Sequence, residues 1–275
     1  MRSIIAIIKR NLTNFTRNKF QLAFSLIMPL FLMFTFSFVM KSTVTTYSNP
    51  LNYLIAGVII MTVFQSSLSN STSIIEDISS GFMKEIIVSP TKRWQISLGQ
   101  ISSAVIISVL QGLIVVIMGL FMGLSINPVQ FIAMVFVMIA VGLTFSAMGL
   151  FLATLSKNST TFQMMTNVLL IPLTFLSGAY IPTNAMPKII QPLVYINPLT
   201  YTTSIFRYIT LKMWNLSTDA LVQAGVAFNI NGFIINPYMD LIIILVMCIV
   251  FFTLSVNQFN KADFSRVTVF NHNNK

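Results

Sequence analysis

The chain has 275 residues, of which 55% are hydrophobic and only 8% are charged, whereas a soluble domain carries about 25% charged residues. So few charges could not cover the surface of a water-soluble fold of this size, and the high hydrophobicity excludes intrinsic disorder. The formal net charge of +10 fits the excess of Lys and Arg that holds loops on the cytoplasmic side of a bilayer, so we expect no nucleic-acid partner. The composition predicts an all-α integral membrane protein.

Residues 1–19 predict a cytoplasmic amphipathic helix. Within residues 4–15, apolar side chains fall on one helical stripe, opposite a polar and basic face. Such a helix lies in the membrane interface. It is either a simple interfacial anchor or a docking helix for a soluble partner, and the pattern leaves both open.

Six apolar segments follow, each close to the roughly 20 residues that cross a bilayer core about 30 Å thick. They cover residues 20–40, 51–68, 96–120, 131–155, 162–181 and 238–256. Pro29 and Pro172 fall inside the first and the fifth segment, where neighbouring helices can satisfy the freed carbonyl. We therefore expect a six-span transmembrane domain over residues 20–275.

An even number of spans places both termini on one side of the membrane, and the positive-inside rule selects that side. With the termini in the cytoplasm, the cytoplasmic segments hold 12 basic residues and the outer segments hold 4. We expect a multi-pass protein of the plasma membrane with both termini, including the tail 259–275, in the cytoplasm.

The cytoplasmic loop over residues 74–94 holds half of the acidic residues of the chain. Its core, residues 81–90, reads as a short amphipathic helix that is stopped by Pro90. The simpler alternative is a solvated hairpin between two spans.

The outer segment over about 182–237 is rich in proline and in aromatic residues. This composition predicts short helices that re-enter the outer leaflet and pack against protein, where irregular backbone is permitted. One of them should begin at Asn197 and Pro198, with Asn197 as the N-cap and Pro198 at the first helical position. Tyr201 then starts a stripe of apolar and aromatic side chains along one face.

Arg207 lies off that stripe and on the outer side, against the positive-inside bias. We expect a partner that holds its charge: an outer-leaflet phosphate, helix carbonyls, Asp219 or Asp240. The alternative is an arginine that extends to water without a fixed partner.

Several kinds of chemistry are absent from the sequence. There is no Gly-rich phosphate loop, and no His, Cys and carboxylate cluster has metal-ligand spacing. The spans contain neutral polar residues rather than the acids of proton relays. We expect a protein that is not an enzyme and that binds no cofactor or metal itself, and whose intramembrane polar side chains mostly make helix–helix hydrogen bonds.

Two blocks of sequence resemble the permease subunits of ATP-binding-cassette exporters of ABC type 2, in the drug- and antibiotic-exporting branch. Residues 81–90 read GFMKEIIVSP, followed by Arg93, and are similar to a family coupling segment that often reads GFLKEILVAP. The second block runs from residue 148 to NPLTY at 197–201, with Arg207 six residues later. The chain departs from the family pattern at Gln100, where lysine is frequent, and at residues 78–79.

The resemblance implies two permeases around a two-fold axis, as a homodimer or with a sister permease, and two cytoplasmic ABC ATPase subunits that hold ATP and Mg. It assigns coupling to the ATPase to Gly81, Lys84, Glu85, Pro90 and Arg93. It assigns an outer helix or lid to Asn197, Pro198, Tyr201 and Arg207. It places the substrate path at the two-fold interface between the permeases, lined by the second and fifth spans, where Gln65, Asn167 and Phe175 are candidates.

The function implied is export of a hydrophobic or amphipathic compound (a drug, antibiotic or peptide), energised by a separate ATPase. Two alternatives stay open: export of a lipid-linked glycan, and a membrane scaffold or sensor that binds an ATPase without transporting. A glycan conduit should carry aromatic stacking residues and a more polar lining than the mostly aliphatic fifth span, which favours drugs or peptides. The substrate itself cannot be identified from the sequence, because apolar pockets discriminate weakly.

Overall fold

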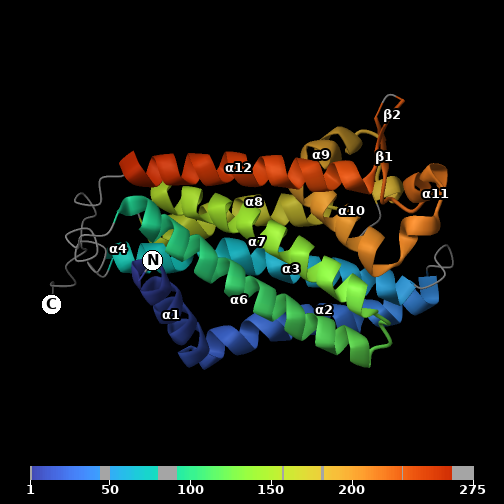
Figure 1. Cartoon of the computed structure of the whole chain (residues 1–275). Coiled ribbons are helices and arrows are strands. Elements are labelled where there is room, and N and C mark those ends of the chain that lie inside the picture. The colour runs from blue at the N-terminus through green and yellow to red at the C-terminus, as the bar shows by residue number, and fades with distance from the viewer. Residues whose placement is uncertain are drawn as a thin grey trace.

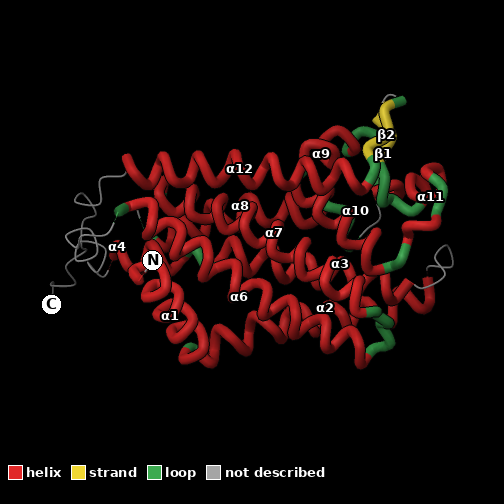
Figure 2. Tube along the Cα trace, viewed as in Figure 1, coloured by secondary structure: helices red, strands yellow, loops and turns green. Residues whose placement is uncertain are grey.

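The computed structural model describes residues 2–43, 50–79, 92–156, 158–180, 183–230 and 232–261, almost all of them in helices (Figures 1 and 2). The helices are α1 (Arg2–Arg17), α2 (Lys19–Thr43), α3 (Pro50–Ser69), α4 (Thr72–Ser79), α6 (Arg93–Phe121), α7 (Pro128–Leu155), α8 (Ser159–Leu176), α9 (Gln191–Ile196), α10 (Pro198–Thr210), α11 (Thr218–Gln223) and α12 (Pro237–Lys261). Two 3-10 turns, Thr183–Ala185 and Met213–Asn215, lie between them.

The long helices run side by side in an elongated bundle, with α4 at one end and α11 at the other (Figure 1). The apolar stretch that includes α3 is 78% buried, whereas that of α12 is only 17% buried. A helix that is apolar all round and lies at the centre of the bundle forms the core. The equally apolar α12 leaves large side chains such as Ile242 and Ile249 exposed, which fits a surface that faces lipid.

Among the described helices, four stretches are long and apolar enough to cross a membrane: Leu51–Asp77, Arg93–Phe121, Pro128–Leu155 and Pro237–Lys261. A fifth is added if Ser3–Arg17 and Lys19–Thr35 count as one span bent by 75°. The six helices α2, α3, α6, α7, α8 and α12 lie where the sequence predicts spans. However, α8, whose first half is polar, is not among the qualifying helices, so a count of six spans stays a prediction.

The α1 helix covers the predicted amphipathic segment, and it packs one side against α6. Its most buried side chains are Ile7 and Asn11, which are 8% and 6% exposed, while Ile5 of the predicted apolar stripe is 64% exposed. Ile7 packs on α6 at Gly99, where an added Cβ would lie 3.1 Å from the Ile7 side chain. The protein neighbour therefore decides which face of α1 is buried.

The segment between α8 and α12 contains α10 as its longest helix. The Asn197 side chain accepts a hydrogen bond from the Leu199 amide at 2.9 Å, and Pro198 follows as the first helical residue, as the Asn-Pro order predicts. Almost all of α10 is buried, and its threonine hydroxyls can be buried without cost to their hydrogen bonding because several of them, including those of Thr202 and Thr203, donate back to backbone carbonyls.

The all-α prediction requires one correction. Strands β1 (Phe228–Ile230) and β2 (Phe233–Ile235) form an antiparallel hairpin at the α11 end (Figure 2). Gly232 adopts a φ of +91° in its turn, a conformation that favours glycine. Each strand has only three residues, too few to produce a visible alternation in the sequence.

Candidate functional site

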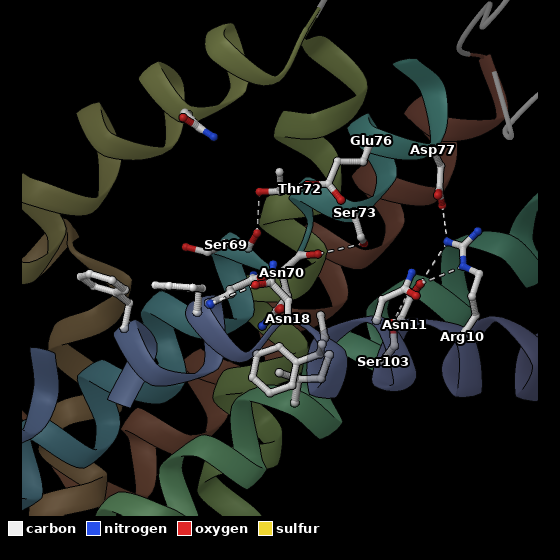
Figure 3. A pocket seen from close by; sticks show the side chains of 18 residues that line it. Arg10, Asn11, Asn18, Ser69, Asn70, Thr72, Ser73, Glu76, Asp77 and Ser103 are labelled. Atoms are coloured by element: carbon white, nitrogen blue, oxygen red, sulfur yellow. Dashed lines mark hydrogen bonds and ion pairs between the residues drawn. The ribbon is translucent and has the colours of Figure 1, made fainter. Parts of the chain in front are cut away.

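A cavity of about 540 Å³ lies toward the α4 end of the bundle, between α1, α2, α4 and α6, with α3 and α8 also at its wall (Figure 3). Most of its lining is neutral and polar: Asn11, Asn14, Asn18, Gln21, Ser69, Asn70, Thr72, Ser73, Ser103 and Gln163. Arg10, Glu76 and Asp77 bring charges to it, and Phe15, Phe20 and Phe24 bring aromatic rings. A polar wall with aromatic rings can contact both parts of an amphipathic molecule.

A second cavity of about 360 Å³ adjoins the first, since both are lined by Phe15, Gln21, Phe24, Ser69 and Asn70. It continues into the bundle between α2 and α3, past Thr62, Ser66 and Pro29. Gln65, a predicted substrate-path residue, lines it. Asn167 and Phe175 line neither of these two cavities, and Phe175 is 60% exposed on α8.

Polar side chains join the helices beside the second cavity. The Ser66 hydroxyl donates to the Gln111 side chain, whose amide donates to the Ser25 hydroxyl. These bonds connect α3, α6 and α2, as predicted for neutral polar residues inside the bundle.

A second polar network joins α1, α4 and α6 at the edge of the larger cavity (Figure 3). The Asp77 carboxylate accepts from the Arg10 guanidinium, with which it forms an ion pair, and from the Gln100 amide at 3.2 Å. The Gln100 carbonyl in turn accepts from Asn11 at 2.7 Å and from Ser73 at 3.2 Å. The sequence singled out Gln100 only as a departure from the family pattern, and here it lies at the centre of the network.

Arg207 is held at the other half of the molecule. It is 1% exposed, and its guanidinium donates to the carbonyls of Gly178 at 2.7 Å and Ala179 at 2.5 Å and to the Tyr53 hydroxyl at 2.6 Å. Its central carbon lies 3.5 Å from the centre of the Tyr53 ring. Of the partners left open by the sequence, backbone carbonyls just after the end of α8 hold the charge, where the helix dipole favours a cation.

The other predicted residues lie apart from the cavities. Tyr201 donates its hydroxyl to the Tyr195 carbonyl and packs edge-on against Phe228. Arg93 begins α6 and donates to the Asn260 carbonyl at 2.7 Å, near the end of α12. Four predicted coupling residues lie outside the described residues: Gly81, Lys84, Glu85 and Pro90.

Across the described ranges, no group of three or more His, Cys, Asp or Glu side chains is arranged to hold a metal ion.

Residues 2–211 match the family described as ABC-2 type transporter. The transport permease ycf38 of Cyanophora paradoxa is 25% identical over 263 residues, which span 92% of this chain and 88% of that protein. YbhR of Escherichia coli K12, named as a multidrug ABC transporter permease, is 28% identical over 158 residues, or 55% of this chain and 43% of YbhR. The inner membrane transport permease YadH of the same strain is 26% identical over 160 residues, or 58% of this chain and 62% of YadH. With three quarters of its length matched and a bundle of apolar helices, the chain belongs to the ABC-2 type transporter family of membrane permeases.

Proposed function

We propose that the chain is the permease subunit of an ATP-driven exporter that moves a hydrophobic or amphipathic compound, such as a drug, antibiotic or peptide, out of the cell. The observation that carries this proposal is the pair of adjoining cavities, which continue from the α4 end into the bundle between α2 and α3. Their polar side chains suit the head of an amphipathic compound, and Phe15 and Phe24, which line both, suit its apolar part. The name of YbhR points to the same class of substrate.

In this proposal the protein has six spans in the plasma membrane, with both termini and the α4 end in the cytoplasm. Two permeases, identical or sister chains, pair with two ABC ATPase subunits, which hold ATP and Mg. The loop 74–94 contacts the ATPase through Gly81, Lys84, Glu85 and Pro90, with Arg93 beside it. Asn197, Pro198, Tyr201 and Arg207 belong to the outer lid.

Export of a lipid-linked glycan is a second candidate. The observation that favours it is the mainly neutral, hydrogen-bonding lining of the larger cavity, together with its three phenylalanines. Amides and hydroxyls can bind sugar hydroxyls, and aromatic rings can stack on sugars. A transport assay separates this candidate from drug export.

The first prediction concerns transport itself. The permease co-expressed with its ABC ATPase and placed in proteoliposomes should accumulate ethidium when ATP reaches the ATPase side. Glu85→Ala should reduce ethidium accumulation per ATP hydrolysed by about 10-fold, equivalent to about 1.4 kcal/mol, because a polar contact with the ATPase is lost. Asp219→Ala, which removes an acid from the first turn of α11 at the other end of the bundle, is the control and should behave as wild type.

Three outcomes of this assay are informative. ATP-dependent movement of a labelled lipid-linked oligosaccharide without ethidium movement would favour glycan export. ATPase binding without movement of either probe would favour a scaffold or sensor. Wild-type coupling in Glu85→Ala would reduce Glu85 to a solvated charge, worth only about 0–1 kcal/mol when paired at a surface.

The second prediction concerns orientation. In a Cys248→Ser background, a cysteine introduced at Ser80 should react with a membrane-impermeant maleimide only when the reagent has access to the cytoplasmic side. The reason is the 12-to-4 distribution of basic residues about the predicted spans. Labelling of intact cells from outside would overturn the proposed topology.

A further inference from the structure

The network around Asp77 connects three elements that are far apart in the sequence. Arg10 and Asn11 come from α1, Ser73 and Asp77 from α4, and Gln100 from α6. Figure 3 shows the side chains of Arg10, Asn11 and Asp77 converging at the edge of the larger cavity. The bonds span 67 residues between Arg10 and Asp77 and 89 residues between Asn11 and Gln100, so they tie separate helices together.

The network is shielded from solvent. Asn11 and Gln100 are 6% and 4% exposed, and the side chains of Arg10 and Asp77 are 26% and 13% exposed. A charge-assisted hydrogen bond in such surroundings is stronger than an exposed ion pair. Removal of one partner would leave buried polar groups with fewer hydrogen bonds, which costs more than the loss of a surface contact.

The position of α4 in the chain makes its contacts in the network important for transmitting movement. This helix has eight residues and follows α3 after a break at residues 70–71. At its other end the chain continues into residues 80–91. Two of its side chains hold α4 to its neighbours in the network: Asp77 contacts α1 and α6, and Ser73 contacts α6.

The α1 helix is in turn fixed to α6. Asn11 donates to Gln100 and to Ser103 at 2.7 and 2.8 Å, and Ile7 fills the space above Gly99. A displacement of α4 would therefore move α1 and α6 together.

We infer that Asp77 and Arg10 are positioning residues for energy coupling: they join α4 to α1 and α6, so that a displacement of the loop after α4 moves these three helices as one unit. Without this link, the same displacement would be absorbed at the break between α3 and α4. The inference relies on the proposed function only for the source of the displacement, the ATPase. The link between the helices does not depend on it.

The link is tested first on the permease alone, in lipid nanodiscs, by hydrogen–deuterium exchange. Arg10→Asp changes only α1, yet it should accelerate exchange in both α1 and α4, because α4 loses its ion pair with α1 and gains a repulsion between two carboxylates. Asp77→Arg changes only α4, and it should likewise accelerate exchange in both α4 and α1. The exchanged pair, Arg10→Asp with Asp77→Arg, should restore protection in both helices. Lys9→Asp makes the same charge change at the neighbouring exposed residue and should leave α4 protected.

The role in coupling is then tested with the ATPase, as ethidium transported per ATP hydrolysed. Each single variant should lower this ratio at least about 5-fold, the lower end of typical coupling between sites, and the exchanged pair should recover to near the wild-type ratio. Asp77→Asn, which keeps the shape of the side chain, replaces the reversal if Asp77→Arg does not fold. A merely structural role would lower the amount of folded protein and leave the ratio unchanged.

The two measurements separate the possible failures. Protection of α4 that is unaffected by Arg10→Asp overturns the link between the helices. Loss of protection with an unchanged ratio overturns the role in coupling. A wild-type complex that moves no probe overturns the proposed function, while the exchange data still decide whether the link exists.

Discussion

Gly57→Ala is expected to lower the free energy of unfolding by about 3 kcal/mol or more, the combined size of an overpacked site and a lost hydrogen bond to a charged group. A Cβ at Gly57 would lie 2.3 Å from the Ala179 carbonyl oxygen and 3.2 Å from a terminal nitrogen of Arg207. The first contact is with backbone, which cannot rotate away as a side chain can. Relief therefore requires α3 to separate from Ala179 and from Arg207, which would break the bond from Arg207 to the Tyr53 hydroxyl on α3.

The measurement is the thermal unfolding midpoint of the purified permease in nanodiscs, followed by tryptophan fluorescence. Gly142→Ala is the matched control, because Gly142 is also a helical glycine and the nearest atoms to an added Cβ there are side-chain atoms, Ser108 Oγ at 3.2 Å and Val105 Cγ1 at 3.3 Å, while the Val105 Cα lies at an ordinary contact distance of 3.6 Å. The control should stay close to the wild-type midpoint. A Gly57→Ala protein as stable as this control would contradict the close approach of α3 to Ala179.

The long helices could be predicted from the sequence because length and hydropathy alone decide whether a segment can be buried in a bilayer. The start of α10 could also be predicted from the sequence, since the Asn-Pro order specifies a cap and a first helical residue locally. The face of α1 that packs on α6 could not be predicted from the sequence. Asn11 looks like part of a polar, exposed face until Gln100 and Ser103 of α6 are placed opposite it.

The cavities were predictable only in part, for a related reason. Gln65 lies on α3 and lines the smaller cavity. Which residues of α8 line a cavity depends on the rotation of α8 about its axis, which its sequence leaves undetermined because polar residues occur on several sides of its first half. Gln163 of α8 reaches the larger cavity, whereas the assignment of Gln65, Asn167 and Phe175 to a substrate path between two permeases stays a prediction.

The sequence limited the candidate partners of Arg207 to a few groups but did not select among them. A charge against the positive-inside bias signals a partner. However, two of its acceptors are the backbone carbonyls of Gly178 and Ala179. Every residue carries a backbone carbonyl, so the sequence does not indicate which ones accept from Arg207. Gly178, with a φ of +82°, is the one local clue that the chain turns sharply there.

Arg207→Ala is expected to be the most damaging single change in this region. It removes the donors to Gly178, Ala179 and Tyr53, and each buried acceptor left without a partner costs about 1–3 kcal/mol. It also removes the guanidinium that lies over the Tyr53 ring, a contact worth about 2 kcal/mol when desolvated. We expect little folded protein and a loss of ethidium export.

Two milder variants grade this effect. Arg207→Lys keeps the charge but lacks the planar fork that reaches both carbonyls, so it should rescue stability and export only in part. Tyr53→Phe keeps the ring and removes one hydroxyl acceptor, so it should cost about 1 kcal/mol. The expected order of thermal midpoints is wild type, Tyr53→Phe, Arg207→Lys and then Arg207→Ala. Full export and a wild-type midpoint in Arg207→Ala would mean that the guanidinium does not hold α3, α10 and the end of α8 together, and the proposed outer lid would lose its support.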